Sequence, residues 1–155
     1  MRLTLLISLY FFYFAILGGI IPYWGLYLNS IFDDTTTVGI LLSSLVFLRI
    51  FAPYFWGFMQ DKTTEPLLWL LASISGAALG FLGLFLAQSI VLKIIFSVLY
   101  GFFFSGIMPQ LDAYLLRTFG THHQYAHIRL SGSLGFLLAS LIFGWLIKVF
   151  FIGVL

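Results

Sequence analysis

Five apolar stretches, each long enough to cross a lipid bilayer, occupy nearly the whole of this 155-residue chain. Hydrophobic residues make up 62% of the sequence and charged residues only 8%, which excludes an ordinary soluble domain. Backbone groups inside a bilayer cannot bond to water, so each stretch must be an α-helix. The sequence therefore predicts an all-α integral membrane protein, with helices at about 4–28, 38–59, 67–88, 93–117 and 129–152.

The first apolar stretch follows Arg2, as the core of a secretion signal would. It runs on through Leu28 without a small-residue cleavage site, so we expect a transmembrane helix rather than a cleaved leader. With the N-terminus inside, the predicted cytoplasmic side carries most of the basic residues: Arg2, Lys62, Arg117 and Arg129. This bias predicts a multi-pass membrane protein with a cytoplasmic N-terminus.

The first and fourth predicted helices share a pattern of residues. A shift of 87 positions aligns them without gaps and pairs Tyr13 with Tyr100, Gly19 with Gly106, Pro22 with Pro109 and Tyr27 with Tyr114. The two helices are three crossings apart and so run in opposite directions, as in the inverted three-helix repeats of transporters. Chance similarity between two helices rich in glycine and aromatic residues is the alternative.

On the repeat interpretation, residues 1–155 form a single transmembrane domain whose sixth helix is absent. The chain stops at Leu155, at the end of an apolar stretch. We therefore expect a truncated or split polypeptide that lacks a sixth helix and a C-terminal half.

Charged residues inside the apolar stretches are the strongest functional candidates. Asp112 lies within the fourth, where an acid costs roughly 2.5–3.5 kcal/mol on insertion scales. Arg129 opens the fifth and is the expected partner of Asp112, either in a solute site or in a structural salt bridge. Arg49 lies near the middle of the second. It should face a water-filled cavity that suits a polar or anionic solute, or pair with Asp112 or backbone carbonyls.

Other chemistry has weaker support. The chain has no cysteine, and its net charge of +2 does not argue for nucleic acid. His123 and His127 have a spacing that could chelate a metal, with His122 beside them, but a solvated loop is the preferred interpretation. We therefore expect no cofactor, no metal and no enzymatic activity.

Four segments resemble a known family: Gly19–Leu28, Leu48–Lys62, Met108–Leu115 and Tyr125–Phe136. Together they make the chain similar to the N-terminal half of a major facilitator superfamily transporter. Within that superfamily it most resembles the proton symporters related to lactose permease and phenylpropionate permease. The resemblance implies five helices of an N-terminal six-helix bundle.

The resemblance also implies roles for particular residues. Asp112 matches a glutamate that binds substrate, and Arg129 matches the arginine that pairs with it and holds sugar hydroxyls. Gly57 and Asp61 match two residues of the cytoplasmic loop that helps to gate the conformational change. Phe136 replaces a tryptophan that stacks on a galactosyl ring, so galactosides are not expected.

These observations predict a secondary active transporter of a bacterial inner membrane, which takes up a small organic solute with a proton. A sugar, a nucleoside and an aromatic acid are all candidate solutes. Asp112, Arg129, Arg49 and Phe136 would bind the solute. The chain by itself is expected to be inactive without the C-terminal half. The alternative is a small non-transporting subunit that docks on a partner membrane protein through the small residues from Ala72 to Gly83.

Overall fold

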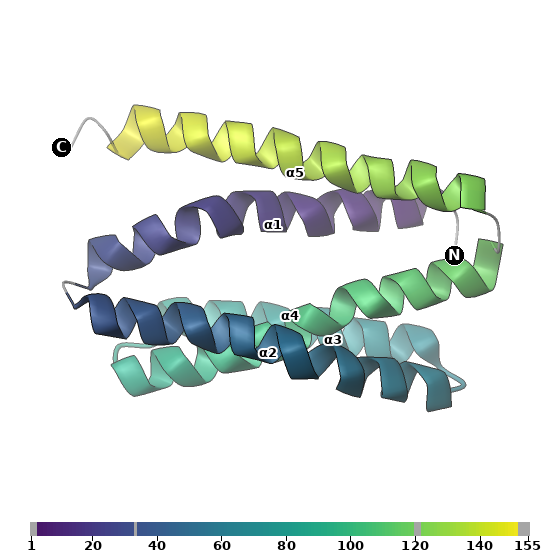
Figure 1. Ribbon diagram of the computed structural model, residues 1–155, viewed down its shortest axis with the longest axis horizontal. Coiled ribbons are helices and arrows are strands. Elements are labelled where there is room, and N and C mark those ends of the chain that lie inside the picture. Colours follow the sequence, from purple (N-terminus) through teal and green to yellow (C-terminus); the bar gives the residue numbers. More distant parts are fainter. Residues whose placement is uncertain (1–2, 33, 120–121, 152–155) are drawn as a thin grey trace. The chain divides into compact units, whose positions relative to one another are not determined.

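The computed structural model describes residues 3–32, 34–119 and 122–151. The elements in these ranges are α1 (Leu3–Ile31), α2 (Thr35–Lys62), α3 (Pro66–Leu86), α4 (Ile90–Phe119) and α5 (His122–Phe151). Each contains a stretch long and apolar enough to cross a membrane. The described residues form five helices and no strand (Figure 1), which confirms the predicted all-α membrane fold.

Most helix ends lie beyond the predicted bounds, although α3 ends at Leu86, two residues short of the predicted 88, and local capping helps to fix where α2 and α3 begin. The Asp34 carboxylate accepts hydrogen bonds from the backbone N–H groups of Thr36 and Thr37, each at 3.0 Å, and so caps α2. Pro66 is the first residue of α3. A backbone N–H at this position would have no partner within the helix, so the N–H that proline lacks costs no hydrogen bond. α5 begins at His122 rather than near residue 129, so the histidines expected in a loop belong to its first turns.

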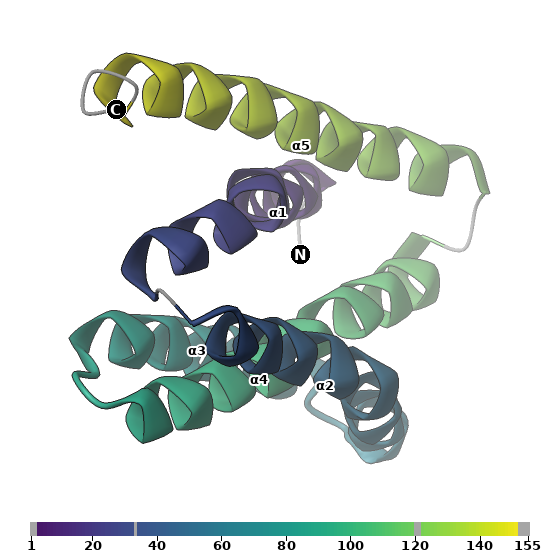
Figure 2. The same cartoon turned by 60° about the vertical axis from the view of Figure 1, so that its left-hand side comes forward.

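The described residues form two compact units, one made of α1 and α5 and the other of α2, α3 and α4. In the first unit, α1 and α5 run side by side in the same direction (Figure 1, Figure 2). A Cβ atom added at Gly18 would strike the carbonyl oxygen of Phe136, and one added at Gly135 would strike that of Phe11. The α1–α5 contact is therefore backbone against backbone, which only glycine permits at these two positions.

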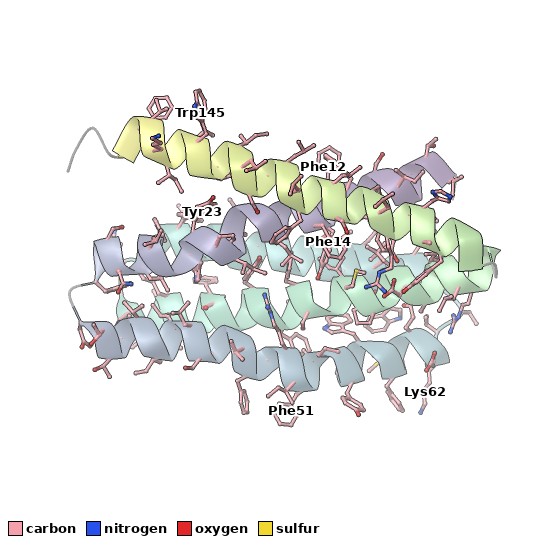
Figure 3. The ribbon with its side chains drawn as sticks, turned by 45° about the horizontal axis from the view of Figure 1, so that its top comes forward. Phe12, Phe14, Tyr23, Phe51, Lys62 and Trp145 are labelled. Atoms are coloured by element: carbon pink, nitrogen blue, oxygen red, sulfur yellow. The ribbon has the colours of Figure 1, made fainter. Side chains whose placement is uncertain are left out.

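Hydroxyl groups add polar links between α1 and α5. Ser140 Oγ donates to the carbonyl of Gly18 at 3.0 Å, and Tyr23 OH donates to the carbonyl of Ser140 at 2.6 Å. Figure 3 shows Tyr23 pointing from α1 toward α5, with Trp145 on the opposite side of α5. In a membrane such bonds are worth about 0.6 kcal/mol on average. They orient the two helices about their long axes.

In the second unit, α3 packs antiparallel to α4 through a row of glycines. The row seats Gly76 against Phe103, Gly80 against Tyr100 and Gly83 against Phe96. A Cβ atom on Gly80 would lie 2.7 Å from the backbone nitrogen of Tyr100, so this approach also excludes a side chain. The glycine-rich face of α3 is thus occupied by α4 of its own unit. Ala72 and Ala78 of the same stretch are exposed, and docking of α3 on a partner protein stays a prediction.

α2 packs on α4 through Trp56. Its ring lies against Gly106, and its indole Nε1 donates to the carbonyl of Phe102 at 2.9 Å. The ring centroid of Trp69 on α3 is 6.3 Å away in an edge-on arrangement. Phe51 projects from the other side of α2, away from α4 (Figure 3). Trp56 therefore joins all three helices of this unit.

The two units repeat one packing contact at the offset that relates their sequences. A shift of 87 positions carries Leu3, the first residue of α1, onto Ile90, the first residue of α4. It also carries Thr35 of α2 onto His122 of α5. The shift therefore relates α1 to α4 and α2 to α5.

The same shift relates a pair of contacts. Gly19 of α1 faces the ring of Phe143 of α5, with a built Cβ 3.0 Å from Cε2. In the other unit, Gly106 of α4 faces the ring of Trp56 of α2. Gly19 maps onto Gly106, and Trp56 maps onto Phe143. A glycine–aromatic contact recurring at matched positions on both helices supports a true internal repeat over chance similarity.

Candidate solute-binding and gating residues

The predicted solute-binding residues are divided between the two units. Asp112 lies on α4 and Arg49 on α2, both in the unit made of α2, α3 and α4 (the α2–α4 unit). Arg129 and Phe136 lie on α5 in the other unit. Asp112 is half-buried, whereas Arg49 and Arg129 are exposed. The pairing of Asp112 with Arg129 therefore stays a prediction.

Arg129 is held by a partner one helical turn earlier. Its Nη1 atom donates to the hydroxyl of Tyr125 at 2.7 Å, and its guanidinium carbon lies 5.4 Å from the centroid of the Tyr125 ring. This geometry combines a hydrogen bond with a cation–π contact. Residues four apart lie on one face of a helix, so the spacing itself brings the two together. Tyr125 takes one of the five guanidinium N–H donors and fixes the direction in which Arg129 extends.

Phe136 has a second role that the sequence did not show. Its backbone carbonyl lies against Gly18 in the α1–α5 contact, and its side chain is half-buried. The position of its ring is therefore set by the tightest part of the helix pair. A substitution that separated α1 from α5 would also move this ring.

The two residues predicted to take part in gating, Gly57 and Asp61, lie in the last turns of α2 rather than in a loop. Asp61 forms a salt bridge with Arg117 of α4, with Oδ1 and Nη2 3.2 Å apart. Arg117 Nη2 also donates to the carbonyl of Gln60 at 3.3 Å. A Cβ atom added at Gly57 meets nothing within 4 Å. Arg117 thus ties the ends of α2 and α4 together, and its basic character near a helix end was the only sequence signal for it.

A buried polar contact inside the α2–α4 unit escaped sequence analysis. Gln110 Nε2 donates to Ser73 Oγ at 2.6 Å, and both side chains are fully buried. Gln60 is also buried, at 2% exposure, and among the described residues its amide atoms have no hydrogen-bond partner. Uncharged amides give no signal in a charge-based search. The helical spacing of Trp56 and Gln60 was the only clue that they share a buried face.

The metal interpretation of the histidines has no further support. His127 lies on an exposed part of α5. Among the side chains that the structure describes, which do not include those of His122 and His123, no group of three potential ligands among His, Cys, Asp and Glu was found.

The five long apolar helices of the described residues define a multi-pass membrane protein. A family model described as "MFS_1 like family" matches residues 3–155. The chain belongs to this family, and its resemblance to major facilitator superfamily transporters is confirmed. Membership indicates a family of transporters.

Two curated relatives agree with this assignment. The chain is 34% identical over 149 residues to a maltose permease of Geobacillus stearothermophilus, a match that covers 94% of this chain and 37% of the permease. It is 37% identical over 131 residues to the uncharacterized transporter YwbF of Bacillus subtilis strain 168, covering 82% of this chain and 32% of that protein. The chain thus spans about a third of the length of these relatives. No solved structure matches it.

Proposed function

We propose that this chain forms the N-terminal helices of a proton-coupled secondary transporter that takes up a sugar. The observation that carries the proposal is the match to a maltose permease along nearly the whole chain. The acid and the two arginines within apolar helices support it, because intramembrane charges mark solute and ion pathways. A neutral sugar presents many hydroxyl groups, which bind both to carboxylate acceptors and to guanidinium donors.

In this proposal Asp112 accepts hydrogen bonds from sugar hydroxyls and Arg129 donates to them. Tyr125 restricts Arg129 to one direction, so less side-chain entropy is lost when a sugar binds. Phe136 offers an aromatic ring to the apolar face of the sugar. Arg49 keeps the pathway polar. A proton would be carried with the sugar, as the family resemblance implies.

The cytoplasmic ends of α2 and α4 would take part in gating. The Asp61–Arg117 salt bridge joins these two helices and is solvent-exposed, with side-chain exposures of 80% and 47%. An exposed ion pair costs little to break, which suits a contact that opens and closes during transport. The open space beside Gly57 would allow another segment to approach α2 there.

Uptake by proteoliposomes tests the proposal, with the longest protein that the gene encodes and radiolabelled maltose. We expect uptake driven by an inward proton gradient and abolished by a protonophore. Asp112→Asn and Arg129→Ala should each lower initial uptake at least tenfold, about 1.4 kcal/mol of lost interaction. Lys148→Ala, at the other end of α5, is the matched control and should retain uptake. Unchanged uptake in both site variants would remove the site assignment.

The 155-residue chain by itself should not transport, because the relatives it matches are about three times as long. Proteoliposomes that contain only this chain, in amounts matched by immunoblot, measure this directly. Proton-driven maltose uptake by the chain alone would contradict the proposed dependence on a C-terminal half. A self-associated bundle would then become the working hypothesis.

A further inference from the structure

Two glutamine side chains lie fully buried at one level of the α2–α4 unit. Gln60 of α2 is 2% exposed and Gln110 of α4 is 1% exposed. Each stands four residues, or about one helical turn, after one half of the contact between Trp56 and Gly106. Because α2 and α4 run in the same direction (Figure 1), one turn beyond that contact brings both glutamines to the same depth in the unit.

Both glutamines face the interior of this unit. Residues four apart share one face of a helix, and Trp56, one turn before Gln60, contacts α4 and α3. On α4, Gln110 Nε2 donates to Ser73 Oγ of α3 at 2.6 Å, so the Gln110 amide extends toward α3. The two amides are therefore directed into the space that α2, α3 and α4 share.

Part of the hydrogen-bonding capacity of these amides is unused. Among the residues that the structure describes, Nε2 and Oε1 of Gln60 and Oε1 of Gln110 are buried without a hydrogen-bond partner. Ser73 cannot satisfy the two oxygens, because its one hydroxyl proton is donated to the carbonyl of Trp69 at 3.0 Å. Native proteins pair nearly all buried polar groups, either with protein or with ordered water. The two amide oxygens therefore need a donor that is not one of these side chains.

The chemistry of the unpaired atoms selects the class of ligand. Gln60 supplies a neutral donor and a neutral acceptor, and Gln110 supplies a second neutral acceptor. Water both donates and accepts, and buried water typically makes about three hydrogen bonds to such groups. A metal cation would find only two neutral amide oxygens, and an anion would find a single amide NH₂ group. A buried charge needs stronger pairing than either set provides.

We propose that the amides of Gln60 and Gln110 bind an ordered water molecule between α2 and α4. Water reaches this site from the predicted cytoplasmic end, where Arg117 Nη2 donates to the backbone carbonyl of Gln60 at 3.3 Å. The Arg117 side chain is 47% exposed, so solvent lies close to the residue whose amide is buried. The bound water joins α2 to the α3–α4 pair beside the Asp61–Arg117 salt bridge. The proposal does not depend on which solute, if any, is transported.

Hydroxyl-radical labelling tests this site in the longest protein that the gene encodes. An X-ray pulse splits water where it stands, so a buried ring is oxidised only if a water molecule lies close to it. The probe is Trp56, which is 2% exposed, and the control is Tyr10 of α1, which is 0% exposed. Mass spectrometry measures both oxidation rates. Each rate is divided by that of the same residue in the unfolded protein, which removes the difference in reactivity between the two rings.

We expect Trp56 to be oxidised at least fivefold faster than Tyr10 after this correction. Gln60→Leu combined with Gln110→Leu removes all the unpaired amide atoms and should reduce the Trp56 rate to that of Tyr10. Gln88→Leu, at an exposed position between α3 and α4, is the matched control and should leave the Trp56 rate unchanged. Equal rates for the two rings in the unsubstituted protein, or an unchanged Trp56 rate in the folded double variant, would overturn the proposal.

A structure of the unsubstituted protein, at a resolution that shows ordered water, is a second measurement that needs no variant to fold. We expect a water oxygen about 2.7–3.2 Å from both Gln60 Nε2 and Gln110 Oε1. A direct hydrogen bond between these two atoms would overturn the proposal, and so would the pairing of both amides with other protein groups. Neither measurement uses uptake, so failure of the proposed function and failure of this proposal are distinguishable.

Discussion

The α1–α5 pair and the α2–α4 unit both use glycine to bring helices together, but the glycines face different groups. In the pair, Gly18 and Gly135 each face a backbone carbonyl of the opposite helix. In the α2–α4 unit, Gly76, Gly83 and Gly106 face aromatic rings, whereas a Cβ atom on Gly80 would lie 2.7 Å from the backbone nitrogen of Tyr100. Backbone cannot move aside without bending a helix, whereas a ring can rotate about its side-chain bonds. Gly18 and Gly135 should therefore be less tolerant of added volume than the glycines that face rings.

The polar links differ in the same way. The pair uses the hydroxyls of Tyr23 and Ser140 against backbone carbonyls, which every residue provides. The α2–α4 unit also has a bond to backbone, from Trp56 to the carbonyl of Phe102, but adds a buried bond between two side chains, Gln110 and Ser73. A bond to backbone depends on one side chain, and a bond between side chains depends on two. The Gln110–Ser73 bond therefore specifies its partner residue more strictly than a bond to a backbone carbonyl does.

The largest expected effect is the loss of the α1–α5 contact in Gly18→Leu. Added volume in a close contact costs about 1–3 kcal/mol, and the carbonyl facing Gly18 places this site at the upper end. Gly83→Leu, which faces the ring of Phe96, should cost less. The fraction folded in detergent against added SDS measures both. Equal costs would break the comparison between the two units.

Gly25→Leu is the control for added volume on α1. A Cβ atom at Gly25 meets nothing within 4 Å, and Leu is a better helix former than Gly. Its stability should therefore be unchanged or slightly higher. A loss as large as that of Gly18→Leu would mean that bulk anywhere on α1 is harmful, and that the close contact is not the cause.

The next effect concerns the buried Gln110–Ser73 bond. Gln110→Leu leaves the Ser73 hydroxyl without this donor, and hydrogen bonds between membrane helices are worth about 0.6 to 1.7 kcal/mol. Ser73→Ala should cost a similar amount. The double variant should cost less than the sum of the two, because no polar partner is then left unpaired. Additive losses in the same SDS titration would show that the two side chains do not interact.

A smaller effect is expected for the Asp61–Arg117 salt bridge. Both side chains are well exposed, so solvent screening limits its contribution to about 0–1 kcal/mol. Asp61→Asn should lower stability slightly, and the difference should vanish in high salt. Exchanging the two residues, Asp61→Arg with Arg117→Asp, should restore part of the lost stability. A loss that persists at high salt would point to a structural role beyond the ion pair.

The smallest effect concerns Asp34, at the start of the α2–α4 unit. Hydrogen bonds from the Thr37 hydroxyl and from the amides of Thr36 and Thr37 hold the pKa of Asp34 below its usual value of 3.8. Because the pKa is lower in the folded state, the ionised carboxylate stabilises the cap fully at pH values above the pKa of the unfolded state. That stabilisation is lost as the pH falls through the lower, folded value. Amide hydrogen exchange in the first turn of α2 should therefore rise, relative to its intrinsic rate, only at acidic pH below about 4. In Asp34→Asn this pH dependence should disappear.

Sequence analysis predicted much of the fold because membrane helices can be recognised from the length and hydropathy of apolar stretches. It missed where α5 begins, since a helix can continue past the bilayer into polar residues such as His122. It found the charged candidates Asp112 and Arg129 because charge is rare in this chain. It did not find Arg117 as the partner of Asp61, because two residues 56 positions apart meet only through the packing of α2 on α4.

The sequence by itself determined that this chain is a set of five membrane helices, and it suggested an internal repeat between the first and the fourth. Lipid leaves no other way to satisfy the backbone, and a repeat is visible as identity at a constant offset. Only the tertiary structure decided which face of each helix is covered. Glycines at Gly18 and Gly76 look alike in sequence, yet one meets a backbone carbonyl and the other a phenyl ring. That distinction depends on which residue a helix distant in the sequence places opposite the glycine, and the residues around the glycine do not indicate it.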